Sequence, residues 1–338
     1  MEEKENLDHI RQARIQNLTD IADKGINPFK YSFGKNIKAQ ALQEKYADLE
    51  AGVETDDWYA VAGRITAIRN TGMFMDLQDD SGKIQLFCHK ENMGVDKFKE
   101  LKLLDIGDII GCTGAVRRTP RGELSLKVNE VTLLTKSLRA LPEKFHGLTD
   151  LETRYRQRYI DLIMNENVRK TFRIRSQIIT KIREYLTNQG FLEVETPMLH
   201  TKASGANAKP FVTHHNALDM DMVLRIAPEL HLKRLLVGGV SEKIFELNRN
   251  FRNEGIDTRH NPEFTMIEMY QAYVDYNEMM ALVENMVSSV AMDVLGTMKI
   301  TYCGKEIDLT PPWDRKTMIG AISEYTGMDF SSVVNYEE

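Results

Sequence analysis

Cysteine is scarce in this chain of 338 residues. Only Cys88, Cys112 and Cys303 occur, and no two of them form a C-x-x-C pair. This spacing argues against a disulfide framework and against a zinc ribbon, and it favours a reducing compartment. The 9 prolines and 21 glycines are too few for a fibrous or low-complexity chain.

Long apolar runs are absent as well. No segment approaches the roughly 20 apolar residues that span a bilayer. The N-terminal sequence MEEKENLDHIRQAR lacks the apolar stretch of a signal peptide. We therefore expect a soluble, cytoplasmic protein without a membrane partner. The net charge of −6 rules out a uniformly basic protein that coats DNA, but it allows a local nucleic-acid site.

Hydrophobic periodicity divides the chain into four parts, and the expected fold class is α+β. An N-terminal helical extension is followed by five strands of period two, which fit an OB-fold barrel with one inserted helix. A linker then leads to a long amphipathic helix and an antiparallel sheet flanked by helices. The four parts are residues 1–55, 56–138, 139–165 and 166–338.

Aromatic side chains alternate with polar ones on one face of the barrel strands. Phe74 shares its side with Asp76, and Phe87 shares its side with Gln85. Unpaired bases stack on such rings at about 1–3 kcal/mol per base, and Gln85 and Glu123 can read base edges. From the residues alone, packing of these rings against another domain explains the pattern equally well.

A second group of polar residues follows two strands between residues 243 and 273. On the first strand, one side carries Glu246, Asn248, Asn250, Arg252 and Glu254. On the second strand, Phe264, Glu268 and Tyr270 share a side. If the strands form a hairpin, one face presents a cation, carboxylates, a ring and a phenol. Such a face suits a ligand with a phosphate, a base and an amine, although each residue taken singly also fits a surface ion pair or a core position.

Several strings then resemble a known family. NFRNEG and RHNPEF resemble motif 2 of the class II aminoacyl-tRNA synthetases, and GFLEVETPML resembles motif 1. KFHGLTDLETRYRQRYIDL and PFVTHHNALDMDMVLRIAPELHLKRLLVGG are similar to the lysyl group in particular. The resemblance implies ATP-dependent activation of L-lysine to lysyl-adenylate, transfer to tRNA(Lys), and a homodimer through the motif 1 helix and strand.

The resemblance also implies roles for individual residues. Arg252 is the expected catalytic residue, which holds the ATP α-phosphate and the carboxylate of lysine. The other expected ATP contacts are Asn253, Glu254, His260, Asn261 and Phe264. The other expected lysine contacts are Gly205, Glu229, Glu268 and Tyr270. The expected anticodon contacts are Phe74, Gln85 and Glu123.

The third motif of the family, which carries metal ligands and further ATP and lysine contacts, is not found before Glu338. We therefore expect Mg2+ to accompany ATP, but no metal ligand within this chain. The chain is expected to be a fragment that ends in the first residues of a helix at SSVVNYEE, or else a short form that binds without activating. Two alternatives stay open: a catalytically inactive tRNA-binding or regulatory module, and an aspartyl or asparaginyl relative.

Overall fold

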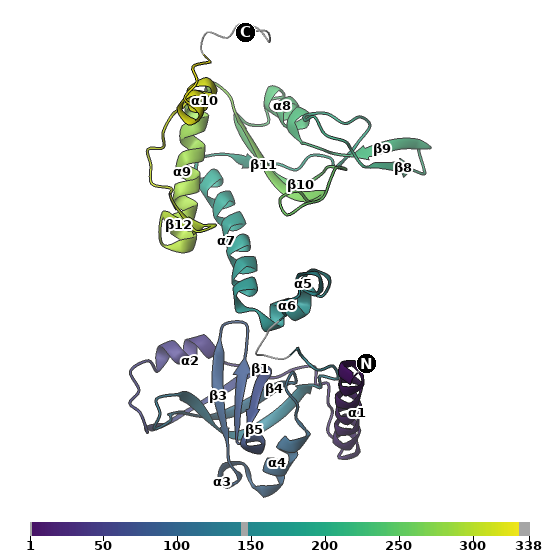
Figure 1. Cartoon of the computed structure of the whole chain (residues 1–338), viewed down its shortest axis with the longest axis vertical. Helices are drawn as coiled ribbons and strands as arrows, with labels where there is room; N and C mark the ends of the chain where they lie inside the picture. Colours follow the sequence, from purple (N-terminus) through teal and green to yellow (C-terminus); the bar gives the residue numbers. More distant parts are fainter. Residues whose placement is uncertain (1, 143–147, 331–338) are drawn as a thin grey trace. The chain divides into compact units, whose positions relative to one another are not determined.

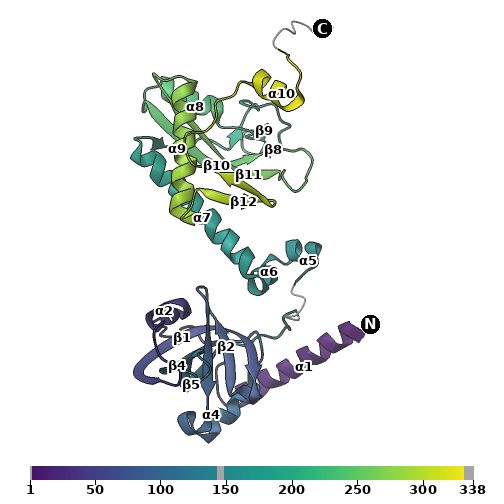
Figure 2. The ribbon, with the colours of Figure 1, turned by 60° about the vertical axis from the view of Figure 1, so that its left-hand side comes forward.

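The structure is a computed structural model that describes residues 2–142 and 148–330 (Figure 1). The chain forms two compact units, Met1–Asn165 and Glu166–Glu338, and each is described by itself. Figure 2 shows both from a second direction. Among the described residues, no helix has the length and apolar character to cross a membrane.

The first unit contains a closed barrel of five strands, as the alternation predicts. These strands are β1 (Glu54–Arg69), β2 (Phe74–Gln78), β3 (Lys83–Cys88), β4 (Ile109–Arg118) and β5 (Leu124–Thr135), in the spatial order β1-β2-β3-β5-β4. The β3–β5 pair is parallel and closes the barrel, whereas the other pairs are antiparallel. The short helix η1 (Asn70–Gly72) joins β1 to β2, and α3 (Lys90–Met93), α4 (Val95–Glu100) and η2 (Leu101–Leu103) stand at the predicted insertion.

Alternate residues of the strands fill the barrel, because successive side chains of a strand point to opposite faces. Met75, Leu86 and Leu126 are fully buried. Ser125 lies on the side of β5 opposite to Leu124 and Leu126, yet it is also fully buried. The reason is local: its hydroxyl donates a hydrogen bond of 2.9 Å to Oε1 of Gln85 on the neighbouring strand β3.

Two helices of the N-terminal extension are fixed to the barrel by polar contacts. In α1 (Glu2–Asp23), Arg14 donates to the carbonyls of Ser137 and Arg139. The first residue of α2 (Ala39–Lys45) donates its N–H to the carboxylate of Asp79, which also binds Lys35. Burial alone would raise the pKa of Asp79, but the hydrogen bonds from Lys35, Ser81 and two backbone N–H groups hold it well below its ordinary value.

The segment 139–165, expected to be a linker, contains two short helices after the undescribed residues 143–147. They are α5 (Leu151–Arg156) and α6 (Arg158–Met164). Asp161 is fully buried and binds Arg154 and Arg158. This ion cluster gives the segment a definite structure.

The second unit is built around the hairpin of β10 (Lys243–Phe251) and β11 (Glu263–Gln271), which is antiparallel as expected. The short strand β6 (Leu192–Glu193) extends the sheet, but it pairs with β10 in parallel, so the expectation of a wholly antiparallel sheet is wrong at this edge. The parallel direction is possible because about fifty residues separate the two strands and supply the crossover that such pairing needs. The odd-numbered residues of the hairpin, with Phe245 and Leu247 buried, face the core formed with α7 (Glu166–Asn188) and α9 (Tyr276–Leu295).

The remaining elements of this unit surround the hairpin. A second sheet has the order β7-β9-β8, with β7 (Leu199–His200), β8 (Val212–His215) and β9 (Met220–Leu224), and α8 (Glu229–Val237) follows it. The hairpin β12 (Lys299–Tyr302) and β13 (Lys305–Asp308) and the helix α10 (Met318–Thr326) were not anticipated from the sequence. The helix expected to begin at residues 331–338 lies outside the described residues.

Candidate functional site

The register of β10 and β11 brings the even-numbered polar residues of both strands to one face. Glu246 lies opposite Glu268, and Asn250 lies opposite Phe264. The odd-numbered residues of the same strands pack against α7 and α9. The polar face therefore lies on the side of the hairpin away from these helices, as the alternation predicts.

Arg252 follows directly after β10 and lies over the ring of Phe264, with 5.2 Å between the guanidinium carbon and the ring centroid. Its Nε is buried and has no hydrogen-bond partner among the described residues. A cavity of about 520 Å³ opens beside this pair. A buried donor without an acceptor is costly, so the cavity suits an anionic ligand that approaches Arg252.

The loop between the two strands forms the rest of this cavity, which is lined by Glu254, Gly255, Ile256, Asp257, Arg259, His260 and Asn261 in addition to Arg252 and Phe264. Asp257 accepts from the backbone N–H of Arg259 and from Nδ1 of His260, and these bonds keep the pKa of Asp257 low. Asn253, an expected ATP contact, is not among the lining residues; its N–H donates to the carbonyl of Lys209. The structure thus gathers five of the six expected ATP contacts around one cavity.

Further along β11, Tyr270 donates a hydrogen bond of 2.9 Å to Glu268. Burial raises the pKa of Glu268, and the negative charges of Glu229 and Glu246 raise it further. Burial and the bond to Glu268 also raise the pKa of Tyr270. A half-buried carboxylate close to a second acid is poised to accept a cation.

Glu229, the first residue of α8, belongs to the same neighbourhood. It forms an ion pair of 2.5 Å with Lys233 one turn later, and the Lys233 ammonium lies 5.8 Å from the centre of the Tyr270 ring. Lys233 was not singled out from the sequence. Its i,i+4 spacing from Glu229 was the available signal, but that spacing is equally typical of a surface ion pair.

Gly205 lies against Glu229. Its φ of +86° is a conformation that glycine adopts without strain. A Cβ at this position would lie 3.0 Å from Cβ of Glu229 and 3.3 Å from Cβ of Ala227. The structure therefore brings together Gly205 and Glu229, and places Glu229 near Glu268 and Tyr270.

Glu246 is placed on the polar face by the alternation, but its environment differs from that of Glu268. It is 1% exposed and forms an ion pair of 2.6 Å with the fully buried Arg225. Thr196 donates to its second oxygen at 2.7 Å. Glu246 is thus occupied by structural partners. No sequence signal marked Arg225, because it stands within the apolar string VLRIAP.

On the barrel, the expected anticodon contacts lie on neighbouring strands. Phe74 packs against Phe87 with 5.3 Å between ring centroids, and Arg117 lies 4.6 Å from the centre of the Phe87 ring. Gln85 is held by Ser125, as described above. Glu123 is exposed directly before β5, where its N–H donates to Oγ1 of Thr119. The face thus combines half-buried rings with amide, carboxylate and guanidinium groups.

Among residues 2–142 and 148–330, no three histidine, cysteine, aspartate or glutamate side chains come together in a way that fits a metal ion.

Comparison with known proteins gives two family matches and a set of curated relatives. Residues 150–333 match the family described as tRNA synthetases class II (D, K and N). Residues 59–134 match the family described as OB-fold nucleic acid binding domain.

The relatives include three proteins named Lysine--tRNA ligase. The one from Trichormus variabilis is 55% identical over 339 residues, which cover 97% of this chain and 60% of the relative. Those from Carboxydothermus hydrogenoformans and Syntrophomonas wolfei are 52% and 50% identical, and each match covers 98% of this chain and 67% of the relative. The chain thus spans 60–67% of the length of these relatives.

Proposed function

Because the chain belongs to the tRNA synthetases class II (D, K and N), we propose that it carries out the ATP-dependent activation of L-lysine and its transfer to tRNA(Lys). The observation that carries this proposal is the charge pattern around the polar face of the β10–β11 hairpin. Glu268 on β11 and Glu229 at the start of α8 supply two acids, and Arg252 directly after β10 supplies a cation. Lysine at neutral pH carries two ammonium groups and one carboxylate, so this pattern is complementary to it.

The proposed reaction is attack of the lysine carboxylate on the α-phosphate of ATP, with pyrophosphate as the leaving group. It requires no side-chain nucleophile, because the substrate provides one. Positioning of the two reactants and stabilisation of charge on the phosphorus oxygens supply the catalysis. Arg252 is the proposed donor, since its planar guanidinium can bridge two oxygens.

The other proposed ATP contacts are Asn253, Glu254, His260, Asn261 and Phe264. In this arrangement Arg252 leaves the Phe264 ring and moves toward the phosphate, so that adenine stacks on the ring. Mg2+ is proposed to arrive with ATP, and no ligand for it is assigned among the described residues.

At the lysine end, Gly205 and Glu229 are proposed to hold the α-ammonium, and Glu268 with Tyr270 the ε-ammonium. The half-buried carboxylate of Glu268 gives a physical basis for selectivity. An amino acid without the ε-ammonium would leave this group buried and unpaired, which costs binding free energy.

For tRNA, we propose that the barrel reads the anticodon with Phe74, Gln85 and Glu123. The match to a nucleic-acid binding family supports a nucleic-acid ligand for the barrel. That this ligand is the anticodon of tRNA(Lys) is our proposal. A cytoplasmic location and the division into residues 1–55, 56–138, 139–165 and 166–338 are parts of the same proposal.

We further propose a homodimer through α7 and β6. An open groove of about 460 Å³ runs beside α7 and is lined largely by apolar side chains, among them Ile174, Ile178 and Ile182. Phe172 on α7 and Leu192 on β6 are 48% and 44% exposed. A second copy of the chain would bury these side chains.

The test compares the wild-type chain with Glu268→Gln. We expect lysine binding to weaken about 30-fold, or about 2 kcal/mol, because the variant lacks the charge that pairs with the ε-ammonium. ATP binding should change less than about twofold. Calorimetric titration with each ligand, together with lysine-dependent exchange of pyrophosphate, gives the measurement.

The matched control is Glu263→Gln, since Glu263 stands on the same strand but is exposed. Equal losses of lysine and ATP binding would contradict the assignment. Preferential binding of aspartate or asparagine would point to a relative of different specificity. Binding of tRNA without binding of lysine or ATP would point to an inactive tRNA-binding module.

A further inference from the structure

A second cavity of about 470 Å³ lies between α8 and the segment that follows β7. Thr201, Lys202 and Ser204 contribute from that segment, and His231 and Arg234 contribute from α8. This cavity shares no lining residue with the one beside Arg252. None of its lining residues carries a carboxylate.

The geometry of α8 separates this cavity from the proposed lysine site. Glu229 and Lys233 are four residues apart and therefore share one side of the helix. His231 and Arg234 are offset from that side by more than a quarter turn, at 100° per residue. One helix thus presents Glu229 toward Glu268, and presents His231 and Arg234 toward the second cavity.

The positive charge of the second cavity is not neutralised in the part of the chain that the structure describes. There, no carboxylate pairs with Lys202, His231 or Arg234. Other basic residues nearby do have acidic partners: Lys233 binds Glu229, and Arg225 binds Glu246. An unneutralised basic cavity in a chain of net charge −6 attracts an anion.

One side chain of the cavity, His231, is held by a second ring. The ring of His231 packs against that of His200 with 4.7 Å between centroids. His200 is buried, and its Nε2 lies 2.9 Å from the carbonyl oxygen of Pro197. Because a carbonyl only accepts, Nε2 carries the proton, and His200 supports the His231 ring from behind.

We propose that this cavity binds phosphate groups of an RNA strand. The inference rests on the proposed function, which makes tRNA a partner. Ammonium, guanidinium and hydroxyl groups are the donors that contact phosphate oxygens in protein–nucleic acid complexes. Two adjacent phosphates of one strand use Lys202 and Arg234 together, whereas Thr201 and Ser204 add neutral donors.

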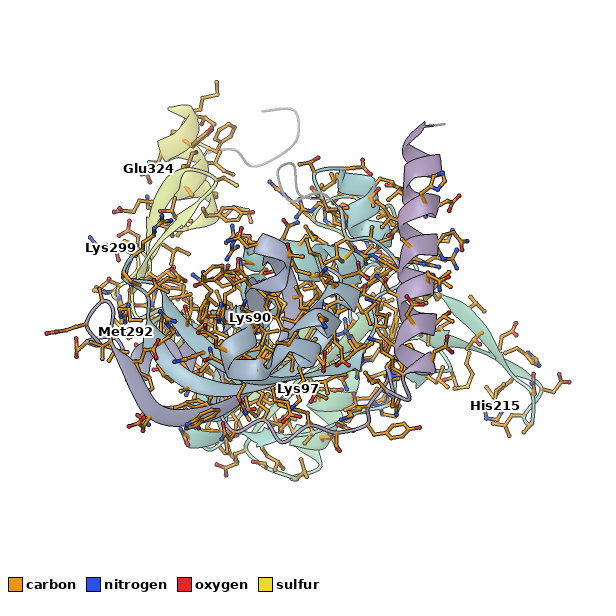
Figure 3. The ribbon with its side chains drawn as sticks, turned by 90° about the horizontal axis from the view of Figure 1, so that it is seen from below. Lys90, Lys97, His215, Met292, Lys299 and Glu324 are labelled. Atoms are coloured by element: carbon orange, nitrogen blue, oxygen red, sulfur yellow. The ribbon has the colours of Figure 1, made fainter. Side chains whose placement is uncertain are left out.

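The experiment measures RNA binding by the double variant Lys202→Gln/Arg234→Gln of the 338-residue chain. Its matched control is Lys299→Gln/Lys305→Gln on the β12–β13 hairpin, where Figure 3 labels Lys299. Both variants lose two positive charges from the second unit. A difference in RNA affinity between them therefore shows that the location of the lost charges matters. The probe is a fluorescein-labelled RNA hairpin with a single-stranded 3′ end, and its anisotropy is followed at several KCl concentrations.

We expect the cavity variant to bind the RNA about tenfold more weakly than the control variant does. The slope of log affinity against log salt should fall by about 0.7 to 0.9 for each lost phosphate contact. The lysine and ATP affinities of both variants should equal those of the wild type, and equal melting temperatures show that both variants fold. Equal RNA affinities and salt slopes for the cavity and control variants would overturn the proposal.

Two further measurements identify the anion that the cavity binds. Inorganic pyrophosphate is titrated by calorimetry, and loss of its binding without loss of RNA binding would assign the cavity to a free phosphate and overturn the RNA assignment. A glutamate-rich peptide that competes with the RNA only when the cavity is intact would assign it to an acidic protein segment instead. If the wild type binds no lysine but the RNA difference persists, the proposed function fails and the cavity assignment stands.

Discussion

Glu246 and Glu268 lie opposite each other on β10 and β11, yet their surroundings differ. Glu246 is enclosed by Arg225 and Thr196, whereas Glu268 is half-buried and bonded only to Tyr270 among the hydrogen bonds of the described residues. The first carboxylate has its charge balanced within the protein. The second is available to a ligand.

Glu246→Gln is expected to lower the free energy of unfolding by about 3 kcal/mol, because it leaves Arg225 charged and buried without an anion. Urea unfolding of the chain measures this change. The control Glu263→Gln removes an exposed acid that lies 3.5 Å from Arg249, and it should cost less than about 1 kcal/mol. Equal costs for the two variants would show that the Arg225–Glu246 pair does not stabilise the fold.

The affinity for lysine should depend on the ionisation of Glu268. Burial, with the charges of Glu229 and Glu246, raises the pKa of Glu268 above its ordinary value of 4.5. The carboxylate binds an ammonium only when ionised, so affinity should be full above the raised pKa and fall as the pH drops through it. Calorimetric titration with lysine from acid to neutral pH measures this fall in affinity, which should be absent in Glu268→Gln. If the affinity of that variant still falls with pH in the same way, the titrating group is not Glu268.

At the scale of residues, the sequence predicts well which side chains share one face of a strand. It predicts poorly which residues form ion pairs with one another. The pleat of a strand places Phe264, Glu268 and Tyr270 on one side whatever the rest of the chain does. The pairing of Glu246 with Arg225 depends instead on how the segment after β9 meets β10, and no local pattern encodes this. The contact of Lys233 with the Tyr270 ring likewise depends on how α8 packs against β11, and no local pattern encodes it.

At the scale of elements, one face of β2 and β3 contains a ring that packs within the barrel and a ring that is proposed to stack on a base of tRNA. Phe74 and Phe87 contact each other, and Arg117 covers Phe87. Phe87 is therefore built into the barrel by its neighbours on two sides. Phe74 has the more open environment of the two among the ring contacts of the described residues, and it is the better candidate for stacking on a base.

Phe74→Ala is expected to weaken tRNA(Lys) binding by about 1–3 kcal/mol, the contribution of one stacked base. Lysine and ATP binding should not change. Trp58→Ala is the matched control, because Trp58 is an aromatic residue of β1 that is 56% exposed. Filter binding of tRNA gives the measurement. Loss of lysine binding in Phe74→Ala would show that the ring has a structural role.

The elements that the sequence did not reveal have identifiable causes. The β12–β13 hairpin turns through Cys303 and Gly304, which both have positive φ. Asn-Gly and Asp-Gly are the usual signals for such a turn, and a cysteine in the first position hides it. α5 begins at a cap that the sequence does show, since Asp150 accepts from the N–H of Thr153. Its apolar periodicity is too short to stand out.

At the scale of the whole molecule, the groove beside α7 predicts an assembly. Ile174→Asp is expected to shift a wild-type dimer to monomer, because the variant places a charge on the proposed interface. Gln177→Asp is the control, since Gln177 is exposed on the same helix and does not line the groove. Sedimentation equilibrium over a range of protein concentrations measures the mass. A wild type that stays monomeric throughout would refute the homodimer.

The contact of Gly205 with Glu229 has a consequence for protein engineering. A library that randomises position 205 alone should return glycine, since every other residue adds an atom that meets the neighbouring Cβ. A side chain at position 205 therefore requires positions 227 and 229 to change with it. Selections that sample these three positions one at a time would keep glycine at position 205, however large the library.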